Sequence, residues 1–289
     1  MRGLFVVMSV IFLTVSCSGD GGKSAPFIET PGTNGTVFAY DGKSLYISYM
    51  GTNFITNTGL NDPIVYASNI LLGVQGGKLW KIEISAAGLK WSQFGEGTSL
   101  FTDSGFVYSR DGNRLRYYLD FVPQNSFEIP GGMNDVRIWG SKFLIGTKDG
   151  KLTIYESDAI GVSPFRVSAE LPEAMMWIVH PSSPYIFYTD RNDRLFVYNI
   201  FSKAVDFIDA PPFPIMRMEI LVADNSLMVY GAERVFVYAE CANRNITGIP
   251  ASPLDIASEK GGKFYYFLYP GKVEILAKDG GMKEGELKF

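Results

Sequence analysis

Histidine and cysteine, the residues most often used in metal centres and in nucleophilic catalysis, are scarce in this chain. Its 289 residues contain one histidine, His180, and two cysteines, Cys17 and Cys241. Zinc and copper sites usually draw on several such ligands, and a general base needs an orienting partner and a nucleophile. We therefore predict no metal centre, no cofactor and no catalytic residue. His180 lies between Val179 and Pro181 in an expected turn, where a structural or solvated role is favoured.

Cys17 follows a short apolar segment at the start of the chain. Leu4–Val15 is interrupted only by Ser9 and Thr14, and Arg2 gives a positive end before it. Twelve residues are too few for a membrane-spanning helix, which needs about 20, but they suit the apolar core of a secretory signal. We expect residues 1–16 to be a signal peptide.

The sequence Leu13-Thr14-Val15-Ser16-Cys17 resembles a bacterial lipobox, although Thr14 stands where an aliphatic residue is usual. The resemblance implies cleavage before Cys17 and lipidation of its sulfur. Ordinary cleavage nearby and an uncleaved anchor are the alternatives. Residues 17–35 are rich in Gly, Ser and Pro and are expected to form a flexible tether. Ser18 after the cysteine favours, by resemblance to enterobacterial sorting, the outer membrane.

With Cys17 lipidated, Cys241 has no partner in the chain for a disulfide. We expect it to be a buried thiol that packs as a small hydrophobe.

Carboxylate, amide and arginine side chains are the remaining source of chemistry. Seven of them precede or begin expected strands: Asn61, Asp62, Asn134, Asp135, Glu173, Arg217 and Asp255. If the fold brings them together, their oxygens could bind a cation or a polar small molecule. The alternative is that they are turn formers or solvated side chains. Whether these residues form one binding site depends on the fold that the surrounding strands adopt.

The clearest of these elements lie in residues 176–208. The runs 176–179, 185–189, 195–198 and 204–208 are aromatic and β-branched, and they are separated by polar turns such as Arg191-Asn192-Asp193-Arg194. Asn and Asp tolerate the left-handed conformations of tight turns, and Pro181 and Pro184 stop a strand. The stretch predicts a four-stranded antiparallel meander.

This unit recurs along the chain. A turn, a basic residue, an aliphatic residue and alternating large residues repeat around Leu79, Leu115, Leu152, Leu195, Val235 and Val273, which are 36, 37, 43, 40 and 38 residues apart. A period near 40 with four short strands predicts an all-β fold, a β-propeller of four-stranded blades.

The blade count follows from the inner strands, which we expect to start near Val37, Ile64, Ser99, Val136, Met176, Met216 and Leu254. These starts predict seven blades in one domain, residues 36–289. Six blades result if the first segment instead completes the last blade. The outer strand of the last blade comes either from Glu286–Phe289 or from a strand borrowed from the N-terminal segment. In a ring of either size, the seven polar residues named above would lie on one face, around the mouth of the central channel.

Residues 180–205 resemble the repeat of the YVTN and lactonase-like propellers. Gly77-Lys78-Leu79-Trp80, followed by Gly88-Leu89-Lys90-Trp91, resembles a degenerate repeat of the quinoprotein-like propellers. The resemblance covers most of residues 36–289, implies a propeller fold and carries over no catalytic residue.

Charge and aromatic content limit the function further. A net charge of −4 with mixed signs provides no basic stripe, so we predict no nucleic-acid binding. Most tryptophans stand in expected strands, where sheet packing explains them better than sugar binding. Methionines in or before inner strands, Met175, Met176, Met216 and Met218, are expected to pack along the channel.

These observations predict a lipid-anchored propeller of the bacterial cell envelope that acts as a non-enzymatic scaffold for envelope protein partners. Two alternatives stay open. One is a lactonase-like or quinoprotein-like enzyme with a carboxylate site at the channel mouth, and the other is a carbohydrate-binding surface protein. Fold alone cannot choose between them.

Overall fold

The fold is known from a computed structural model of the chain. It describes residues 27–29, 36–40, 44–50, 52–56, 59–67, 69–103, 106–159, 164–221, 225–232, 234–239, 243–246, 253–258, 263–277 and 283–288. Those residues form strands and turns without a helix, and hence no helix among them could span a membrane.

The strands form seven four-stranded antiparallel sheets, each built from consecutive strands in meander order. Blade one contains β1 (Phe27–Glu29), β2 (Val37–Tyr40), β3 (Leu45–Tyr49) and β4 (Thr52–Thr56). Blade two contains β5 (Asn61–Ala67), β6 (Ile70–Gln75), β7 (Lys78–Ser85) and β8 (Gly88–Glu96). Blade three contains β9 (Ser99–Asp103), β10 (Phe106–Asp111), β11 (Arg114–Leu119) and β12 (Val122–Glu128).

The second half of the chain continues in the same way. Blade four contains β13 (Met133–Trp139), β14 (Phe143–Lys148), β15 (Lys151–Glu156) and β16 (Arg166–Leu171). Blade five contains β17 (Met176–Val179), β18 (Tyr185–Thr189), β19 (Leu195–Asn199) and β20 (Val205–Asp209). Blade six contains β21 (Arg217–Leu221), β22 (Ser226–Tyr230), β23 (Val235–Ala239) and β24 (Asn243–Ile246). Blade seven contains β25 (Asp255–Ser258), β26 (Phe264–Tyr269), β27 (Lys272–Ala277) and β28 (Lys283–Lys288).

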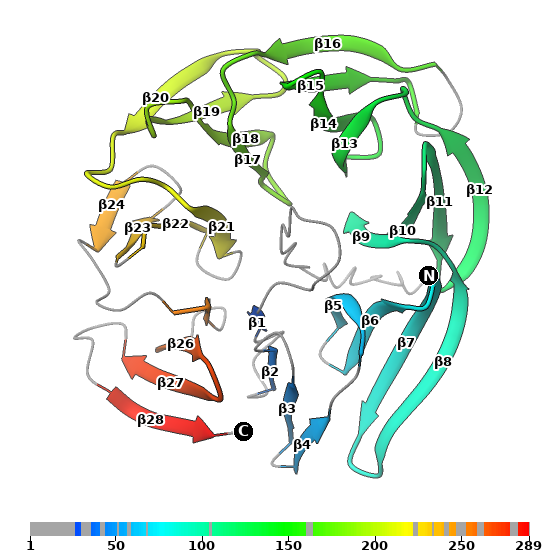
Figure 1. Cartoon of the computed structure of the whole chain (residues 1–289), viewed down its shortest axis with the longest axis vertical. Helices are drawn as coiled ribbons and strands as arrows, with labels where there is room; N and C mark the ends of the chain where they lie inside the picture. The colour runs from blue at the N-terminus through cyan, green and yellow to red at the C-terminus, as the bar shows by residue number, and fades with distance from the viewer. Residues whose placement is uncertain are drawn as a thin grey trace, which may run out of the picture.

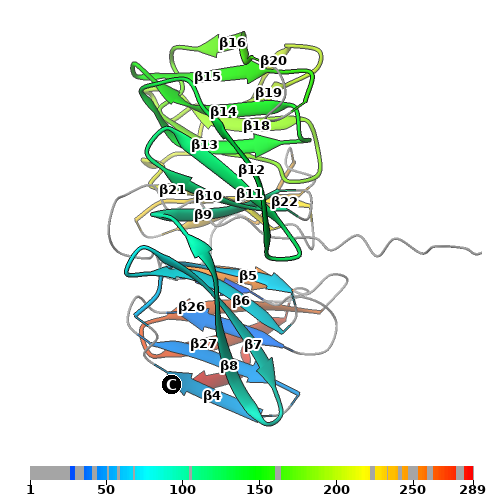
Figure 2. The ribbon, with the colours of Figure 1, turned by 90° about the vertical axis from the view of Figure 1, so that its right-hand side faces the viewer.

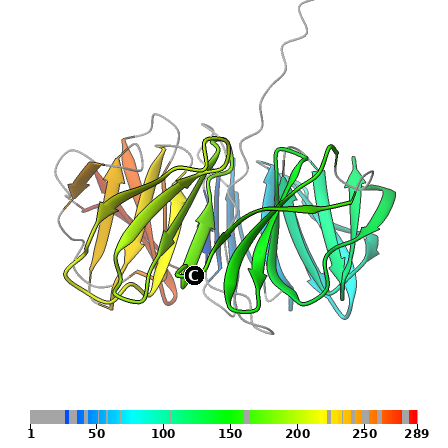
Figure 3. The same cartoon turned by 90° about the horizontal axis from the view of Figure 1, so that it is seen from above.

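The seven sheets are arranged around a centre as the blades of a β-propeller (Figure 1). The first strand of each blade lies innermost and the last outermost, as β9 and β12 or β17 and β20 show. Seen from the side, the blades lie next to one another with their strands running across the thickness of the ring, which is a flattened disc (Figures 2 and 3). The predicted all-β, seven-bladed fold is confirmed, and the six-bladed alternative is excluded.

The aliphatic position of the repeat explains why the blades can pack. Its six members all lie in the third strand of their blades and have no exposed surface: Leu79, Leu115, Leu152, Leu195, Val235 and Val273. In blade one, Leu45 at the start of β3 is buried in the same way. The repeat in the sequence is therefore a repeat of the core.

The core lies between the blades rather than in the channel. Among the described residues, the buried apolar side chains form seven clusters, and each cluster spans two neighbouring blades. One of them joins Ile28 and Tyr46 of blade one to Leu268 and Val273 of blade seven. This packing closes the ring and covers both faces of every sheet, which no blade could do alone.

The turn between β18 and β19 shows how the polar residues of the repeat act. Asp190 accepts hydrogen bonds from the backbone amides of Asn192 and Arg194 at its Oδ1 atom, at 2.9 and 3.0 Å. Its Oδ2 atom accepts the Arg194 Nε–H at 2.7 Å. Asp193 has a φ of 56°, a left-handed conformation that Asp tolerates better than most residues. The hairpin expected here is confirmed.

Blade one differs from the expectation in one respect. The strands around Val37, Leu45 and Phe54 are present, but the innermost strand is β1, and β2 lies second. Phe27–Glu29 therefore belongs to the first blade, although it falls in the range 17–35 that was expected to be a tether. Three residues are too short for a periodic signal, yet Ile28 is buried in the cluster between blades one and seven.

The last blade needs no borrowed strand. Its outer strand is β28, Lys283–Lys288, and each of blades one and seven is formed by a continuous stretch of chain. The ring is thus closed by side-chain packing and by the contact between β1 and β25. Cys17, Cys241 and the remaining residues of the expected signal and tether lie outside the described residues.

Candidate functional site

The inner strands all begin at the same face of the ring, because every blade is a meander that starts with its inner strand. Asn61, Arg217 and Asp255 are the first residues of β5, β21 and β25. Asn134 and Asp135 lie in β13 next to its first residue, and Glu173 precedes β17. The predicted residues therefore lie at one mouth of the channel. Asp62 lies in β5, and its side chain is outside the described part.

Within this set, Arg217 and Asp255 are brought into direct contact. Arg217 Nη2 lies 3.1 Å from Asp255 Oδ1. The exposed side chains of Asn61, Asn134, Asp135 and Glu173 make no hydrogen bond or ion pair to another described residue. The set does not converge as a whole, and one pair of it forms the nucleus of a buried cluster.

Two residues that sequence reasoning missed, Glu219 and Tyr230, complete this cluster. Glu219 Oε2 lies 3.7 Å from Arg217 Nη2 and accepts the Tyr230 hydroxyl at 3.0 Å. The Arg217 guanidinium stacks 4.0 Å from the centre of the Tyr230 ring. Arg217 and Glu219 are two apart on β21 and share a face, and Tyr230 of β22 is the cross-strand partner of Arg217. The alternation along β21 could have indicated Glu219, whereas Tyr230 required the strand register.

Burial dominates the electrostatics of this cluster, which we call the mouth cluster (Arg217, Glu219, Tyr230 and Asp255). Burial raises the pKa of Glu219 well above its ordinary value, and the charge of Asp255 and a hydrogen bond with it raise that pKa further. Burial and the neighbouring Glu219 raise the pKa of Tyr230. Burial works to lower the pKa of Arg217, but Tyr230, Asp255 and Glu219 raise it overall. Two carboxyl groups therefore share one guanidinium, and the pKa of Glu219 is the one that is raised.

Asp255 also holds the ring together. Its Oδ2 atom accepts the backbone N–H of Ile28 in β1 at 2.8 Å, while its Oδ1 atom faces Arg217 of blade six. One buried carboxylate on blade seven thus contacts both of its neighbouring blades. The described residues contain no group of three or more His, Cys, Asp and Glu side chains placed to hold a metal ion.

His180 has a structural role at the opposite face. It is buried in the turn between β17 and β18, its Nε2 atom lies 2.8 Å from Asn225 Oδ1, and its Nδ1 atom accepts the amides of Ser182 and Ser183. Burial lowers its pKa, which the bond to Asn225 partly opposes. The Trp139 indole donates to the His180 carbonyl at 3.0 Å. The residue therefore links blades four, five and six.

The tryptophans pack as expected, since Trp80 and Trp91 lie against the core between blades one and two, and Trp139 and Trp177 against that between blades four and five. Among the methionines, Met218 is buried in the core and Met176 packs against it. Met175 and Met216, just before β17 and β21, are exposed instead.

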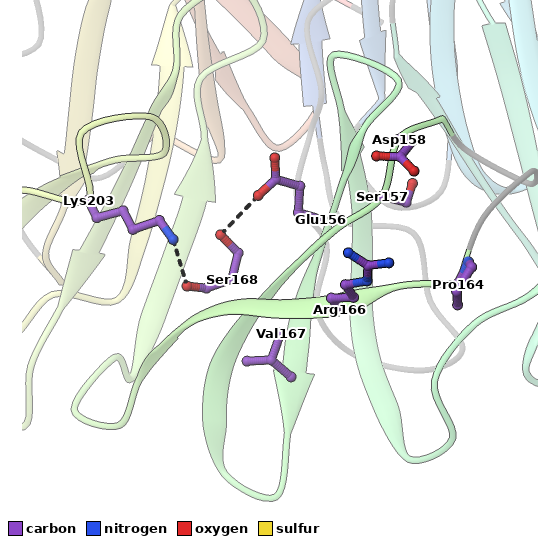
Figure 4. A pocket seen from close by; sticks show the side chains of 8 residues that line it. All are labelled: Glu156, Ser157, Asp158, Pro164, Arg166, Val167, Ser168 and Lys203. Carbon is purple, nitrogen blue, oxygen red and sulfur yellow. Dashed lines mark hydrogen bonds between the residues drawn. The ribbon is translucent and has the colours of Figure 1, made fainter.

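A second candidate site is a groove on the outer side of blade four, where blade five meets it. It has a volume of about 340 Å³. Its lining comes from the end of β15, the start of β16 and the turn before β20: Glu156, Ser157, Asp158, Pro164, Arg166, Val167, Ser168 and Lys203 (Figure 4). We call it the rim groove.

Hydrogen bonds order part of the rim groove. Lys203 Nζ donates to the Ser168 carbonyl at 3.3 Å, which joins the turn of blade five to β16. The Ser168 hydroxyl donates to Glu156 Oε2 at 3.4 Å. The Ser157 hydroxyl, in contrast, has no partner in the described part of the chain, although only 6% of this residue is exposed. The Arg166 guanidinium is exposed and makes no ion pair or hydrogen bond with another described residue.

Large apolar side chains are exposed next to the rim groove. Phe201, in the turn before β20, is 64% exposed although it contacts the Trp139 and Phe143 rings at 5.6 and 6.0 Å. Val205 and Phe207 of β20 are about half exposed. Phe207 contacts Phe196 at 5.7 Å, and Phe196 packs on the core shared with blade four, so this side of β20 faces blade four. Val167 of β16 is exposed as well.

These features define a seven-bladed β-propeller with a polar channel mouth and an apolar outer rim. No protein-family model matches the chain, and no curated protein is similar to it in sequence. Solved structures are similar in fold. PorZ, described as an essential bacterial surface component of the type-IX secretion system of Porphyromonas gingivalis, is 15% identical with a TM-score of 0.62. The match covers 91% of this chain and 38% of the PorZ chain.

Hsv2 of Kluyveromyces lactis is 9% identical, with a TM-score of 0.56 and coverage of 92% of this chain and 99% of Hsv2. Hsv2 of Kluyveromyces marxianus is 8% identical, with a TM-score of 0.53 and coverage of 73% of each chain. At these identities the likeness concerns the fold alone, and the chain spans little more than a third of PorZ.

Proposed function

We propose that this chain is a lipid-anchored propeller of the bacterial cell envelope that binds protein partners without catalysing a reaction. Ser18 after the cysteine favours the outer membrane. The observation that carries the binding role is the set of exposed apolar side chains of blade five beside blade four: Phe201, Val205 and Phe207. Val205 and Phe207 lie two apart on β20 and share a face, and exposed apolar patches mark interaction sites. Aromatic side chains are enriched in such interfaces.

The mouth cluster favours binding over catalysis. A propeller enzyme of the alternative kind would need carboxylates at the channel mouth that are free to meet a substrate or a metal. Asp255 is instead engaged by Arg217 and the Ile28 amide, and Glu219 by Tyr230. Asp255 thus joins neighbouring blades. Asp135 and Glu173 are exposed, but among the described residues they belong to no group of three or more His, Cys, Asp and Glu side chains placed to hold a metal ion.

The envelope location rests on the sequence around Cys17 and on analogy. The apolar segment before Cys17 and the lipobox resemblance support secretion and lipidation. PorZ, a surface component of a bacterial secretion system, is an example of a similar fold at that location.

A crosslinked pull-down of the full-length protein from its native membranes tests this function, with a Cys17→Ala variant run in parallel. We expect defined envelope proteins with the wild type and fewer with the variant. Phe207→Ser should lose those partners, whereas Ile55→Ser, which alters an equally exposed side chain on β4 of blade one, should retain them. Recovery of no partner, or equal recovery with Phe207→Ser, would contradict the proposal.

A further inference from the structure

The rim groove contains donors that have no acceptor. The Ser157 hydroxyl is buried and unpartnered among the described residues, and the Arg166 guanidinium on the neighbouring strand is likewise unpaired. In Figure 4 the Arg166 side chain points toward the side on which Ser157 and Asp158 lie. A buried hydroxyl without a partner is unfavourable, so an acceptor that reached it would relieve that cost.

The charges of the groove restrict the acceptor. Arg166 and Lys203 are balanced by Glu156 and Asp158, so the groove has no net positive field for a polyanion or a multiply charged phosphate. A single carboxylate suits it better, because the guanidinium fork matches carboxylate oxygens in a bidentate geometry. Glu156 is already engaged by the Ser168 hydroxyl.

The strand beside the groove indicates what kind of ligand would contain this carboxylate. β16 is the outermost strand of its sheet, so one of its edges has no strand partner among the described residues. Extended peptides pair with such edges through backbone hydrogen bonds and place alternate side chains into adjoining pockets. Val167 on β16 and Val205 and Phe207 on β20 offer apolar contacts on either side of the groove.

We propose that the rim groove binds an Asp or Glu side chain of an extended segment of a protein partner, which pairs with the free edge of β16. The carboxylate meets the Arg166 guanidinium and the Ser157 hydroxyl, and flanking apolar residues of the segment meet Val167 and Phe207. This inference rests on the proposed function, because it names the chemistry of the partner.

A phage-displayed library of random dodecapeptides, selected on the purified full-length chain, tests the proposal directly. We expect enriched peptides with one acidic residue between apolar or β-branched residues. Their affinity, measured by fluorescence anisotropy, should fall about tenfold or more in Arg166→Gln, as expected for loss of a hydrogen bond to a charged group. Arg114→Gln, an exposed arginine on β11 of blade three, should bind as the wild type does.

Ser157→Ala separates a binding role from a structural one. The substitution removes a hydroxyl that has no partner in the described structure, so the melting temperature should stay or rise while peptide affinity falls several-fold. The proposal is overturned by a selection that yields no peptide, by peptides that lack an acidic residue, by equal affinity of Arg166→Gln, or by competition from inorganic phosphate but not from N-acetylglutamate. If the pull-down recovers partners nonetheless, the scaffold function stands and only the groove assignment fails.

Discussion

At the scale of single residues, the mouth cluster contains titratable side chains whose pKa values differ from their ordinary values. Glu219 has a raised pKa in the folded state because it is buried beside Asp255, whereas an unfolded glutamate titrates near 4.3. Between the unfolded and the folded pKa of this residue, the folded state therefore binds more protons than the unfolded state does. The stability linked to this proton is fully present below the unfolded pKa and is lost as the pH rises through the folded pKa.

Glu219→Gln should consequently stabilise the protein at alkaline pH, because the amide imitates the protonated carboxyl and does not titrate. We expect its melting temperature to exceed that of the wild type by roughly 2 °C or more at pH 8 and to approach it at pH 5. Scanning calorimetry at both pH values measures this, with Glu96→Gln, an exposed residue at the end of β8, as the control. A constant difference between the variants across pH would contradict the assignment.

The residue scale also shows what the sequence could not provide. Arg217 and Asp255 were predicted as members of one site, and the structure joins them, because both begin inner strands of neighbouring blades. Glu219 and Tyr230 were missed since their partners depend on strand register and burial. Ser157 and Arg166 carried no signal in the sequence, because they lie nine positions apart and line one groove only when β15 and β16 pair.

At the scale of elements, the short strand β1 has a larger role than its length suggests. It pairs with β2, buries Ile28 between blades one and seven, and donates the Ile28 amide to Asp255. The sequence predicted the other strands from aromatic and β-branched alternation, but three residues cannot show a period. The expected tether, residues 17–35, therefore included β1, which belongs to the first blade.

Asp255→Ala should loosen this strand specifically. It leaves the Ile28 amide unpaired and the Arg217 guanidinium without its closest carboxylate, and breaking a buried ion pair costs about 3–5 kcal/mol. We expect lower stability to chemical denaturation and faster hydrogen exchange at the Ile28 amide than at core amides of β14. Asp206→Ala, on the exposed strand β20, should change neither. Unaltered exchange at Ile28 would show that Asp255 does not hold β1.

At the scale of the whole molecule, stability depends on the closure of the ring, since each interblade cluster is shared by two neighbours. The repeat spacing was sufficient to predict the seven-bladed ring, because the same buried aliphatic position recurs in successive blades. The way in which the ring closes was not predictable, because it rests on a contact between residues 227 positions apart.

Two truncated chains test the closure. A chain that begins at residue 27 retains β1 and should melt close to the full-length protein. A chain that begins at residue 30 lacks β1, including the buried Ile28 and its hydrogen bonds, and should lose about 3–5 kcal/mol. Thermal melts followed by circular dichroism compare the two. Equal melting temperatures would mean that the ring closes without β1.

The position of β1 determines how the proposed anchor would hold the molecule. β1 is the innermost strand of blade one, and the amide of its residue Ile28 contacts Asp255. The chain therefore enters the propeller beside the central channel and not at the outer edge of a blade. Ten residue steps separate Phe27 from Cys17, a reach of at most about 35 Å. If Cys17 is lipidated, the channel mouth at which β1 begins would be the part of the propeller nearest to the anchor.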